Sequence, residues 1–319
     1  MGRGFSYRDQ HGERLGDAET RRVQELVIPP AWRDVWITPH ENGHLQAVGT
    51  DDAGRRQYLY HPQWRLRRDV AKFRRMEEFG QALATARERV VDDLGRRGMP
   101  VERACAAAVR LLDLGYFRIG NDVYADTHGS FGLTTLERRH VRRTQEQLVF
   151  SFTGKSGVDH EITIDDAVVI EAIEVMRRRR SADDPRLLAY KQGRSWRSML
   201  PALVNDYVRE TTGLDGTAKD FRTWHATVLA AVSLAETSEP GETEASRKRA
   251  VSGAMKEVAS FLGNTPTMAR SSYVDPRVPE AYRQGRTIAA ATGASYDTTD
   301  ERQAALERAT LALLDEEDR

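Results

Sequence analysis

Cysteine and long apolar runs are scarce in this sequence. Cys105 is the one cysteine among 319 residues, so no disulfide forms within the chain and no cysteine pair is present to hold zinc. That usage is typical of a reducing compartment. No apolar run approaches the roughly 18 residues that a membrane-spanning helix needs, and the first residues contain no hydrophobic signal segment. We therefore expect a cytoplasmic protein without a membrane span.

An excess of charge of either sign is also missing, because 48 Lys and Arg balance 48 Asp and Glu. This balance alone argues against a DNA-binding protein, since affinity for duplex DNA comes largely from cations that displace counterions from phosphate. The distribution reverses the argument, because arginine clusters recur along the chain and guanidinium groups bind phosphate oxygens in pairs. Any one cluster is equally consistent with a solvated helix face. The clusters lie at residues 55–56, 65–68, 74–75, 138–143 and 177–180, and the end of the chain is acidic.

The hydrophobic pattern changes along the first hundred residues. Up to about residue 65, short alternating segments bounded by Pro, Gly, Asp and Asn predict a small β-sheet, with strands around residues 35–37, 45–49 and 57–60. From residue 66 to about residue 94, apolar residues at three- and four-residue spacing predict a helix, which residues 95–100 end. We therefore predict a β-rich N-terminal domain with a closing helix over residues 1–94 and a mainly helical domain over residues 95–319.

The second domain contains one predicted β-excursion. Leu148, Phe150 and Phe152 alternate before a Thr-Gly-Lys-Ser-Gly turn, and His160 begins a second alternating run, which predicts a hairpin with Lys155 at its tip. The predicted fold class is therefore α+β, with a small β-rich N-terminal domain and a larger, mainly helical domain that contains a β-hairpin. The predicted helices cover residues 101–114, 165–180, 198–212, 219–235, 242–262 and 279–292.

Residues suited to phosphate chemistry occur at four places in the second domain. One arginine follows an apolar helix, a lysine occupies the hairpin turn, a lysine and an arginine open a later helix, and an asparagine precedes a late tyrosine. Each signal is weak alone, because a tyrosine in a protein of this size is more often structural than nucleophilic. The candidate catalytic residues are Arg118, Lys155, Lys219, Arg222, Asn264 and Tyr273.

Together and in this order, these stretches resemble the type IB DNA topoisomerases of the compact bacterial and poxvirus-like branch, which share a superfamily with the tyrosine recombinases. The strings Phe-Arg-Ile-Gly, Phe-Thr-Gly-Lys, Lys-Asp-Phe-Arg-Thr-Trp and Leu-Gly-Asn-Thr-Pro carry the resemblance, which extends from about residue 20 to residue 285. Many relatives have histidine at Asn264, and either side chain donates a hydrogen bond to a phosphate oxygen. Lys219 resembles the topoisomerases, because recombinases usually have histidine there.

The resemblance implies an ATP-independent DNA topoisomerase with Tyr273 as nucleophile. Arg118 and Arg222 would hold the non-bridging oxygens and Asn264 would add a donor, so that fixed positive charge replaces a metal. Lys155 would protonate the leaving 5′ oxygen, with Lys219 as a second member of the proton relay. The intermediate would be a 3′-phosphotyrosine, the cut strand would rotate, and religation would follow without a metal or any other cofactor.

The resemblance also implies how DNA is held. Residues of the first domain, at the end of its predicted sheet, would face the major groove of double-stranded DNA, with phosphates held by the arginine clusters. We expect a monomeric clamp on chromosomal DNA, in the nucleoid, without a small-molecule cofactor. The expected DNA-binding residues are Arg55, Arg56, Gln57, Tyr58 and Tyr60.

Two alternatives stay open at the level of sequence. A site-specific tyrosine recombinase uses the same catalytic set, although Lys219 and the β-rich first domain argue against it. A DNA-binding protein that has lost catalysis is the other alternative, because the sequence does not show that the candidate residues converge.

Overall fold

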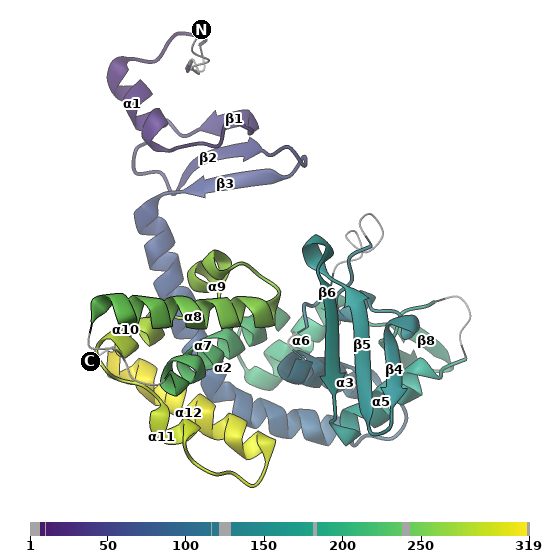
Figure 1. The fold of residues 1–319 in the computed structure, drawn as a ribbon. Helices are drawn as coiled ribbons and strands as arrows, with labels where there is room; N and C mark the ends of the chain where they lie inside the picture. The colour runs from purple at the N-terminus through teal and green to yellow at the C-terminus, as the bar shows by residue number, and fades with distance from the viewer. Residues whose placement is uncertain are drawn as a thin grey trace. The chain divides into compact units, whose positions relative to one another are not determined.

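The computed structural model describes residues 7–9, 11–115, 117–120, 129–180, 184–237 and 243–317. The chain divides into two compact units, Met1–Arg74 and Arg75–Arg319. The first contains a three-stranded sheet together with α1 (Asp17–Glu25) and the start of α2 (Pro62–Leu94), and the second is mainly helical, which confirms the predicted α+β class (Figure 1).

The first unit contains a three-stranded antiparallel sheet in the order β1-β2-β3. Its strands are β1 (Arg33–Ile37), β2 (Leu45–Thr50) and β3 (Arg56–Tyr60), as the alternating pattern predicts. The central strand β2 is the most buried of the three, with Gln46, Ala47, Val48 and Gly49 all buried. The sequence did not predict the helix α1 (Asp17–Glu25), whose nine residues have a single buried side chain.

Helix α2 (Pro62–Leu94) belongs to both units. Its later residues Met76, Phe79, Leu83 and Leu94 are buried in the core of the second unit. The division by contacts therefore falls inside the helix, after Arg74, whereas the predicted boundary lies at the helix end, between residues 94 and 95. The spacing of apolar residues predicts that a segment is a helix, but it does not predict which unit the apolar face of that helix packs against.

The strands of the second unit form a small antiparallel sheet, β4-β5-β6, and a separate hairpin. Phe150 pairs with Ile162 and Phe152 with His160, so the predicted hairpin is confirmed. Alternation did not identify the outer strand β4, because three of its four residues are exposed and two of them are arginines. The strands are β4 (Val141–Thr144), β5 (Gln147–Thr153), β6 (Asp159–Ile164), β7 (Ala189–Gln192) and β8 (Ser195–Ser198).

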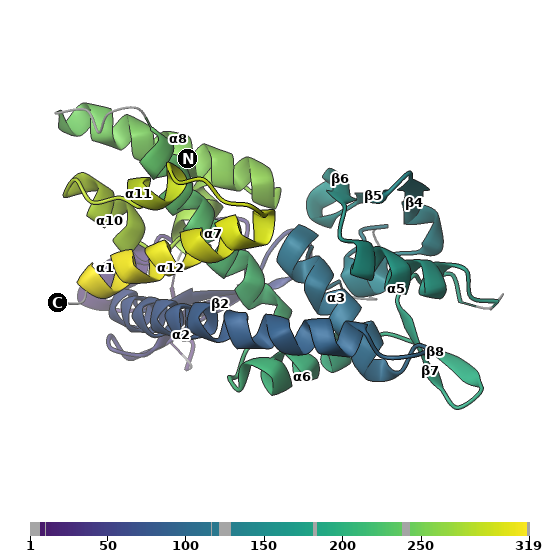
Figure 2. The ribbon, with the colours of Figure 1, turned by 90° about the horizontal axis from the view of Figure 1, so that it is seen from below.

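The helices of the second unit surround α7 (Ala218–Glu236), which contacts α3, α6, α8, α10, α11 and α12. Figure 1 shows β4, β5 and β6 on one side of this unit and α8 to α12 on the other, and Figure 2 gives the same arrangement from below. The other helices are α3 (Val101–Gly115), α5 (Ala167–Arg177), α6 (Pro201–Thr212), α8 (Glu244–Leu262), α9 (Pro266–Ser272), α10 (Arg277–Arg283), α11 (Ala289–Thr292) and α12 (Thr299–Glu317).

One prediction near the end of the chain needs correction. The single helix expected over residues 279–292 is two helices, α10 and α11, because Gly285 takes a left-handed φ of 83° between them. The acidic end is largely part of α12, whose Leu306, Leu313 and Leu314 are buried in the core. Asp318 lies outside the described residues.

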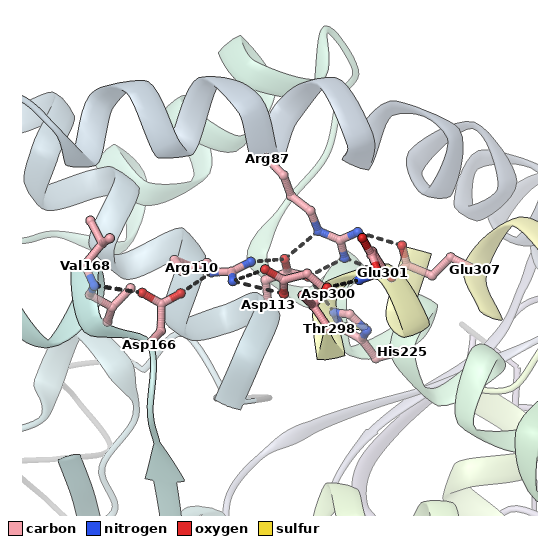
Figure 3. A network of polar contacts seen from close by, with 11 residues as sticks. Arg87, Arg110, Asp113, Asp166, Val168, His225, Thr298, Asp300, Glu301 and Glu307 are labelled. Atoms are coloured by element: carbon pink, nitrogen blue, oxygen red, sulfur yellow. Dashed lines mark hydrogen bonds and ion pairs between the residues drawn. The ribbon is translucent and has the colours of Figure 1, made fainter. Parts of the chain in front are cut away.

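A buried polar network joins α12 to the helices beneath it (Figure 3). Arg87 of α2 donates to Asp113 of α3 through Nε at 2.7 Å and to Glu307 of α12 through Nη1 at 2.7 Å. His225 of α7 contacts the same Asp113 at 2.9 Å, and Arg110 continues the network to Asp166 at 2.8 Å. Four helices are therefore held at one point by polar groups that pair with one another.

Within the predicted basic cluster at residues 177–180, Arg179 serves the interior. Arg179 is 6% exposed and donates to the carbonyl oxygens of Met176 and Leu187, and the half-buried Arg177 pairs with Glu174. These two arginines support the fold, whereas Arg178 and Arg180 are exposed. None of the helices in the described part of the chain combines the length and apolar character that a membrane crossing requires.

Candidate active site

The site is built around the end of α8. Gly263 takes a left-handed φ of 60° after the last helical residue, a conformation that glycine adopts without a Cβ penalty. Thr265 then caps α9 by accepting from the backbone N–H of Met268, and Pro266 occupies the first helical position. The residues between the two helices, Gly263 to Thr265, are thereby held in one turn, and the last carbonyl groups of α8 are accessible to neighbouring side chains.

Two arginines bind these carbonyl groups. Arg118 Nη2 donates to Leu262 O at 3.3 Å and to Gly263 O at 3.2 Å, and Arg222 Nη2 donates to Leu262 O at 2.7 Å. The C-terminal carbonyls of a helix lack intrahelical partners and carry partial negative charge, so they attract cations. The end of α8 therefore brings together two guanidinium groups that would otherwise repel each other.

Burial and this mutual repulsion change the acidity of Arg222. The side chain is 5% exposed, and burial together with the positive charge of Arg118 lowers the pKa of Arg222 to about 10. The group stays charged at neutral pH. An anion placed beside the two arginines would relieve their repulsion, which makes the site suited to a phosphate oxygen.

Asn264 is oriented by Arg118. Arg118 Nη2 donates to Asn264 Oδ1 at 2.8 Å, and because a guanidinium only donates, the amide must present its oxygen there and its Nδ2 elsewhere. Asn264 Nδ2 and Arg118 Nε are buried donors that have no acceptor among the described residues. A buried donor without an acceptor costs about 1–3 kcal/mol, a cost that an anion bound at these atoms would remove.

Tyr273 follows α9 directly and faces Arg222. The guanidinium carbon of Arg222 lies 5.7 Å from the centre of the Tyr273 ring. Burial alone would raise the pKa of the Tyr273 hydroxyl, but the positive charges of Arg222, Arg118 and Lys219 outweigh burial and lower it. The phenolate is thus stabilised by the groups that the sequence predicts as its catalytic partners.

The backbone of Tyr273 is also held by α7. Thr227 Oγ1 lies 3.3 Å from Tyr273 O and accepts from the backbone N–H of Asp275 at 3.1 Å. Since α7 also carries Arg222, one helix fixes both the charged group and the chain around the tyrosine. Lys219 lies one turn before Arg222 on this helix and is exposed.

Lys155 lies apart from these four residues. It begins a single 3₁₀ turn, η3 (Lys155–Gly157), between β5 and β6, and its side chain is exposed. The structure therefore brings Arg118, Arg222, Asn264 and Tyr273 into contact and places Lys155 on the neighbouring hairpin turn. The connection between the turn and the site is His160, a residue that the sequence marked only as part of an alternating strand.

His160 packs against glycines on both sides. A Cβ atom at Gly154 would lie 2.6 Å from His160 Cδ2, and one at Gly263 would lie 2.9 Å from His160 Cε1. Gly154 precedes Lys155 and Gly263 precedes Asn264, so the imidazole separates the hairpin turn from the end of α8. The two glycines are visible in the sequence, but they indicate a close contact with His160 only once the structure shows that the three residues are adjacent.

The predicted DNA-binding residues lie together at β3 in the first unit. Arg55 donates to Asp51 through Nε at 2.9 Å, and Gln57 Nε2 donates to the same carboxylate at 2.9 Å. The hydrogen bonds from Arg55 lower the pKa of Asp51 to about 2, so this carboxylate stays ionised and orders the turn between β2 and β3. Arg56 is exposed on the same strand.

Gln57 and Tyr58 point to opposite faces of the strand, because successive side chains alternate. Tyr58 is 51% exposed and stacks on Tyr60 at 6.2 Å between ring centroids, and Tyr60 stacks on Trp64 at 4.5 Å. This face of the strand is therefore a row of aromatic rings that ends at an exposed tyrosine. Gln57 lies on the other face, where its amide is engaged by Asp51.

Comparison with known proteins identifies the class to which this fold and site belong. The family described as Eukaryotic DNA topoisomerase I, catalytic core, matches residues 61–290, and the family described as Bacterial DNA topoisomerase IB, N-terminal domain, matches residues 4–51. The catalytic-core match covers all six candidate catalytic residues. The chain belongs to the type IB DNA topoisomerases, and it is an isomerase of that class rather than a tyrosine recombinase.

Viral proteins are among its relatives. The DNA topoisomerase 1B of Acanthamoeba polyphaga mimivirus is 28% identical over 285 residues, a match that covers 87% of this chain and 84% of the viral protein. The DNA topoisomerase 1B of Vaccinia virus (strain Copenhagen) is 20% identical over 282 residues, or 86% of this chain and 85% of the relative. The similarity thus extends over most of both chains.

Proposed function

We propose that this topoisomerase relaxes supercoiled DNA by nicking one strand with Tyr273. The Tyr273 oxygen attacks a backbone phosphorus, a Tyr–O–P bond forms, and the bond from phosphorus to the 5′ oxygen breaks. The cut strand rotates about its partner, and the freed 5′-hydroxyl then reverses the reaction. The phosphodiester energy is kept in the 3′-phosphotyrosine, so no ATP is needed. The observation that carries this proposal is the Tyr273 ring beside Arg222, with Arg118 and Asn264 joined to the same helix end.

Charge stabilisation is the main catalytic device in this proposal. Arg118 and Arg222 hold the non-bridging oxygens, and Asn264 Nδ2 adds a neutral donor. Arranging these donors before the reaction avoids reorganisation when negative charge develops, and one such contact typically contributes about 3–4 kcal/mol to lowering the barrier. The two fixed guanidinium charges take the place that a metal ion has in other phosphoryl transfers, so we propose a metal-independent reaction.

The leaving 5′ oxygen needs a proton. Lys155 is placed on an exposed turn, and a DNA strand that reaches Tyr273 would pass the neighbouring hairpin. We assign to Lys155 the protonation of the 5′ oxygen as the P–O bond breaks. Lys219 lowers the pKa of Tyr273 through its charge, and its place one turn from Arg222 suits the role of a second relay member.

The first unit supplies the grip on the duplex in this proposal. Exposed Arg56 and Tyr58 face the DNA, with Tyr60 supporting Tyr58 by stacking, while Arg55 and Gln57 order the preceding turn through Asp51. Phosphate contacts from arginine set the position, and side chains on the strand reach base edges in the major groove. We propose that one copy of the chain closes around chromosomal DNA, in the cytoplasm, as a monomeric clamp.

The test is relaxation of a supercoiled plasmid in EDTA without ATP. The wild-type protein is expected to give relaxed topoisomers, and Tyr273→Phe is expected to bind the plasmid without relaxing it, because only the nucleophilic oxygen is lost. Strict dependence on Mg²⁺ would refute the metal-independent mechanism. Relaxation by Tyr273→Phe would refute the choice of nucleophile, and binding without relaxation by the wild type would favour a DNA-binding protein that has lost catalysis.

A further inference from the structure

We infer that His160 is a positioning residue that holds the Lys155 turn at a fixed place relative to Arg118 and Asn264. The inference rests on the proposed function, because it concerns the proton donor of that reaction. It adds a residue that the sequence motifs do not contain, and it explains how an exposed lysine on a turn reaches a defined position.

The first observation is the packing of the imidazole between two backbone segments. Both Gly154 and Gly263 lie so close to the ring that a Cβ at either position would come within 3 Å of it. Each glycine is the residue immediately before a candidate catalytic residue, Lys155 in one segment and Asn264 in the other. The ring therefore sets the separation between the two segments by direct contact.

The second observation is that the ring itself is fixed. Phe152 lies opposite His160 in the β5–β6 ladder and stacks on it with centroids 5.3 Å apart and planes at 28°. Phe117, the residue before Arg118, also stacks on Phe152, with centroids 5.9 Å apart and planes at 15°. Ring contacts through Phe152 thus connect the Arg118 segment to His160 and its glycine contacts.

The third observation is the charge around the ring. Burial lowers the pKa of His160, and the positive charges of Arg118 and Arg222 lower it further, against the opposing effect of Asp159. At neutral pH the ring is therefore uncharged and adds no repulsion to the two arginines. A neutral planar side chain suits a spacer beside a cationic site.

Three hydrogen bonds of the hairpin turn do not reach α8. Gly154 N–H donates to Val158 O at 2.7 Å, which closes the turn, Thr153 Oγ1 donates to Asp159 Oδ1 at 2.7 Å, and Phe131 N–H donates to Thr153 O at 2.9 Å. Val158 also approaches the end of α8, but its Cγ1 lies 3.8 Å from where a Cβ of Gly263 would be, whereas His160 Cε1 lies 2.9 Å from it. Removing the ring of His160 is expected to leave the hairpin intact and to let Lys155 move relative to the reacting phosphate. A displacement of about 1 Å at a reacting group typically lowers a rate about 100-fold.

The experiment compares two leaving groups. A duplex cleavage site is first mapped with the wild-type protein, and the same site is then prepared with the bridging 5′ oxygen or with sulfur in its place. Sulfur is a leaving group of much lower pKa and departs without a proton. Covalent adduct formation is measured in single turnover for the wild type, His160→Ala, His160→Phe, Gly154→Ala and Lys155→Ala, with duplex binding and thermal unfolding measured for each variant.

We expect His160→Ala to form adduct about 10- to 100-fold more slowly than the wild type on the oxygen site and to recover toward the wild-type rate on the sulfur site. His160→Phe keeps a ring of similar size and should retain most of the oxygen rate. Gly154→Ala keeps His160, but the added Cβ displaces the imidazole ring. The backbone accepts alanine at this position, because φ at Gly154 is −95°. This variant should reproduce the behaviour of His160→Ala, and it tests the same contact if His160→Ala does not fold.

Lys155→Ala separates failure of this inference from failure of the proposed function. If sulfur does not rescue Lys155→Ala, the proton donor in the proposed function is wrong. If sulfur rescues Lys155→Ala, then wild-type oxygen rates in both His160→Ala and Gly154→Ala overturn the positioning role. Equally slow adduct formation by these two variants on oxygen and on sulfur also overturns it, because the defect would then lie in charge stabilisation or in the fold.

Discussion

Replacing Arg87 by methionine tests the buried network that joins α12 to α2, α3 and α7 within the second unit (Figure 3). The substitution keeps much of the side-chain volume and removes the charge that pairs with Asp113 and Glu307, whose side chains are 5% and 6% exposed. Removing one partner of a buried ion pair typically costs about 3–5 kcal/mol. His225 still contacts Asp113 and Gln303 still donates to Glu307, so the lower end of that range applies.

The measurement is thermal unfolding by calorimetry at pH 7. For a unit of this size, each kcal/mol shifts Tm by about 2–4 °C, so about 3 kcal/mol predicts a Tm lowered by about 6–12 °C. Arg283→Met is the matched control, because its pair with Glu280 is exposed and such pairs contribute about 0–1 kcal/mol. Equal, small Tm changes in the two variants would contradict the assignment of the network as a structural anchor.

The same variant has an expected pH dependence. Burial alone would raise the pKa of Asp113, but the charge and hydrogen bonds of Arg87, with those of His225, lower it below that of a free carboxyl group. A group with a lowered folded-state pKa contributes stability that is present above its unfolded pKa of about 3.9 and is lost as the pH falls. The difference in stability between wild type and Arg87→Met should therefore be largest near neutral pH and should narrow below about pH 4.

Three further predictions concern the site, the core and DNA binding. Arg118→Ala and Arg222→Ala should each lower the cleavage rate about 10²- to 10³-fold. Arg118→Lys and Arg222→Lys should recover only part of this loss, because an ammonium group does not make the paired guanidinium contact, and full activity in a lysine variant would argue against that contact. Cys105 is 3% exposed and burial raises its pKa to about 12, so iodoacetamide at pH 8 should label the thiol only after unfolding, and rapid labelling of the native protein would contradict its burial. Plasmid relaxation should weaken steeply with rising salt as phosphate contacts are screened, and a salt-independent rate would argue against them.

Alternation in the sequence predicted β2, β3, β5 and β6, but burial alternates clearly only in β3 and β6, where one face of the strand packs inward. The central strands β2 and β5 have runs of four and three successive buried residues, so their burial is less regular than the alternation in their sequence suggests. Strand β4 has one buried residue among four, so its sequence contains no such pattern. The predicted single helix at residues 279–292 failed because its apolar residues are spaced as in a helix although Gly285 interrupts the backbone.

The sequence predicted which residues form the candidate site and their order along the chain, but it did not predict the contacts that hold those residues in place. Arg118 and Arg179 look alike in sequence, yet one borders the site and the other donates to interior carbonyls. At the carboxyl end of α8, Arg118 binds a carbonyl group 145 positions away and Arg222 binds one 40 positions away, and a local sequence pattern does not reveal such contacts. His160 was hidden for the same reason, because its two glycine contacts come from different segments.

The central claim is that Tyr273 becomes covalently linked to a 3′ phosphate. A duplex that ends a few nucleotides after the mapped cleavage site loses the short 5′-hydroxyl strand once it is cut, so that the adduct is trapped. Protease digestion and mass spectrometry of the DNA-linked peptide then identify the residue and the end of the strand. The expected result is a peptide joined through Tyr273 to a 3′ phosphate, with a 5′-hydroxyl on the released strand. A link through another residue, or to a 5′ phosphate, would contradict the claim.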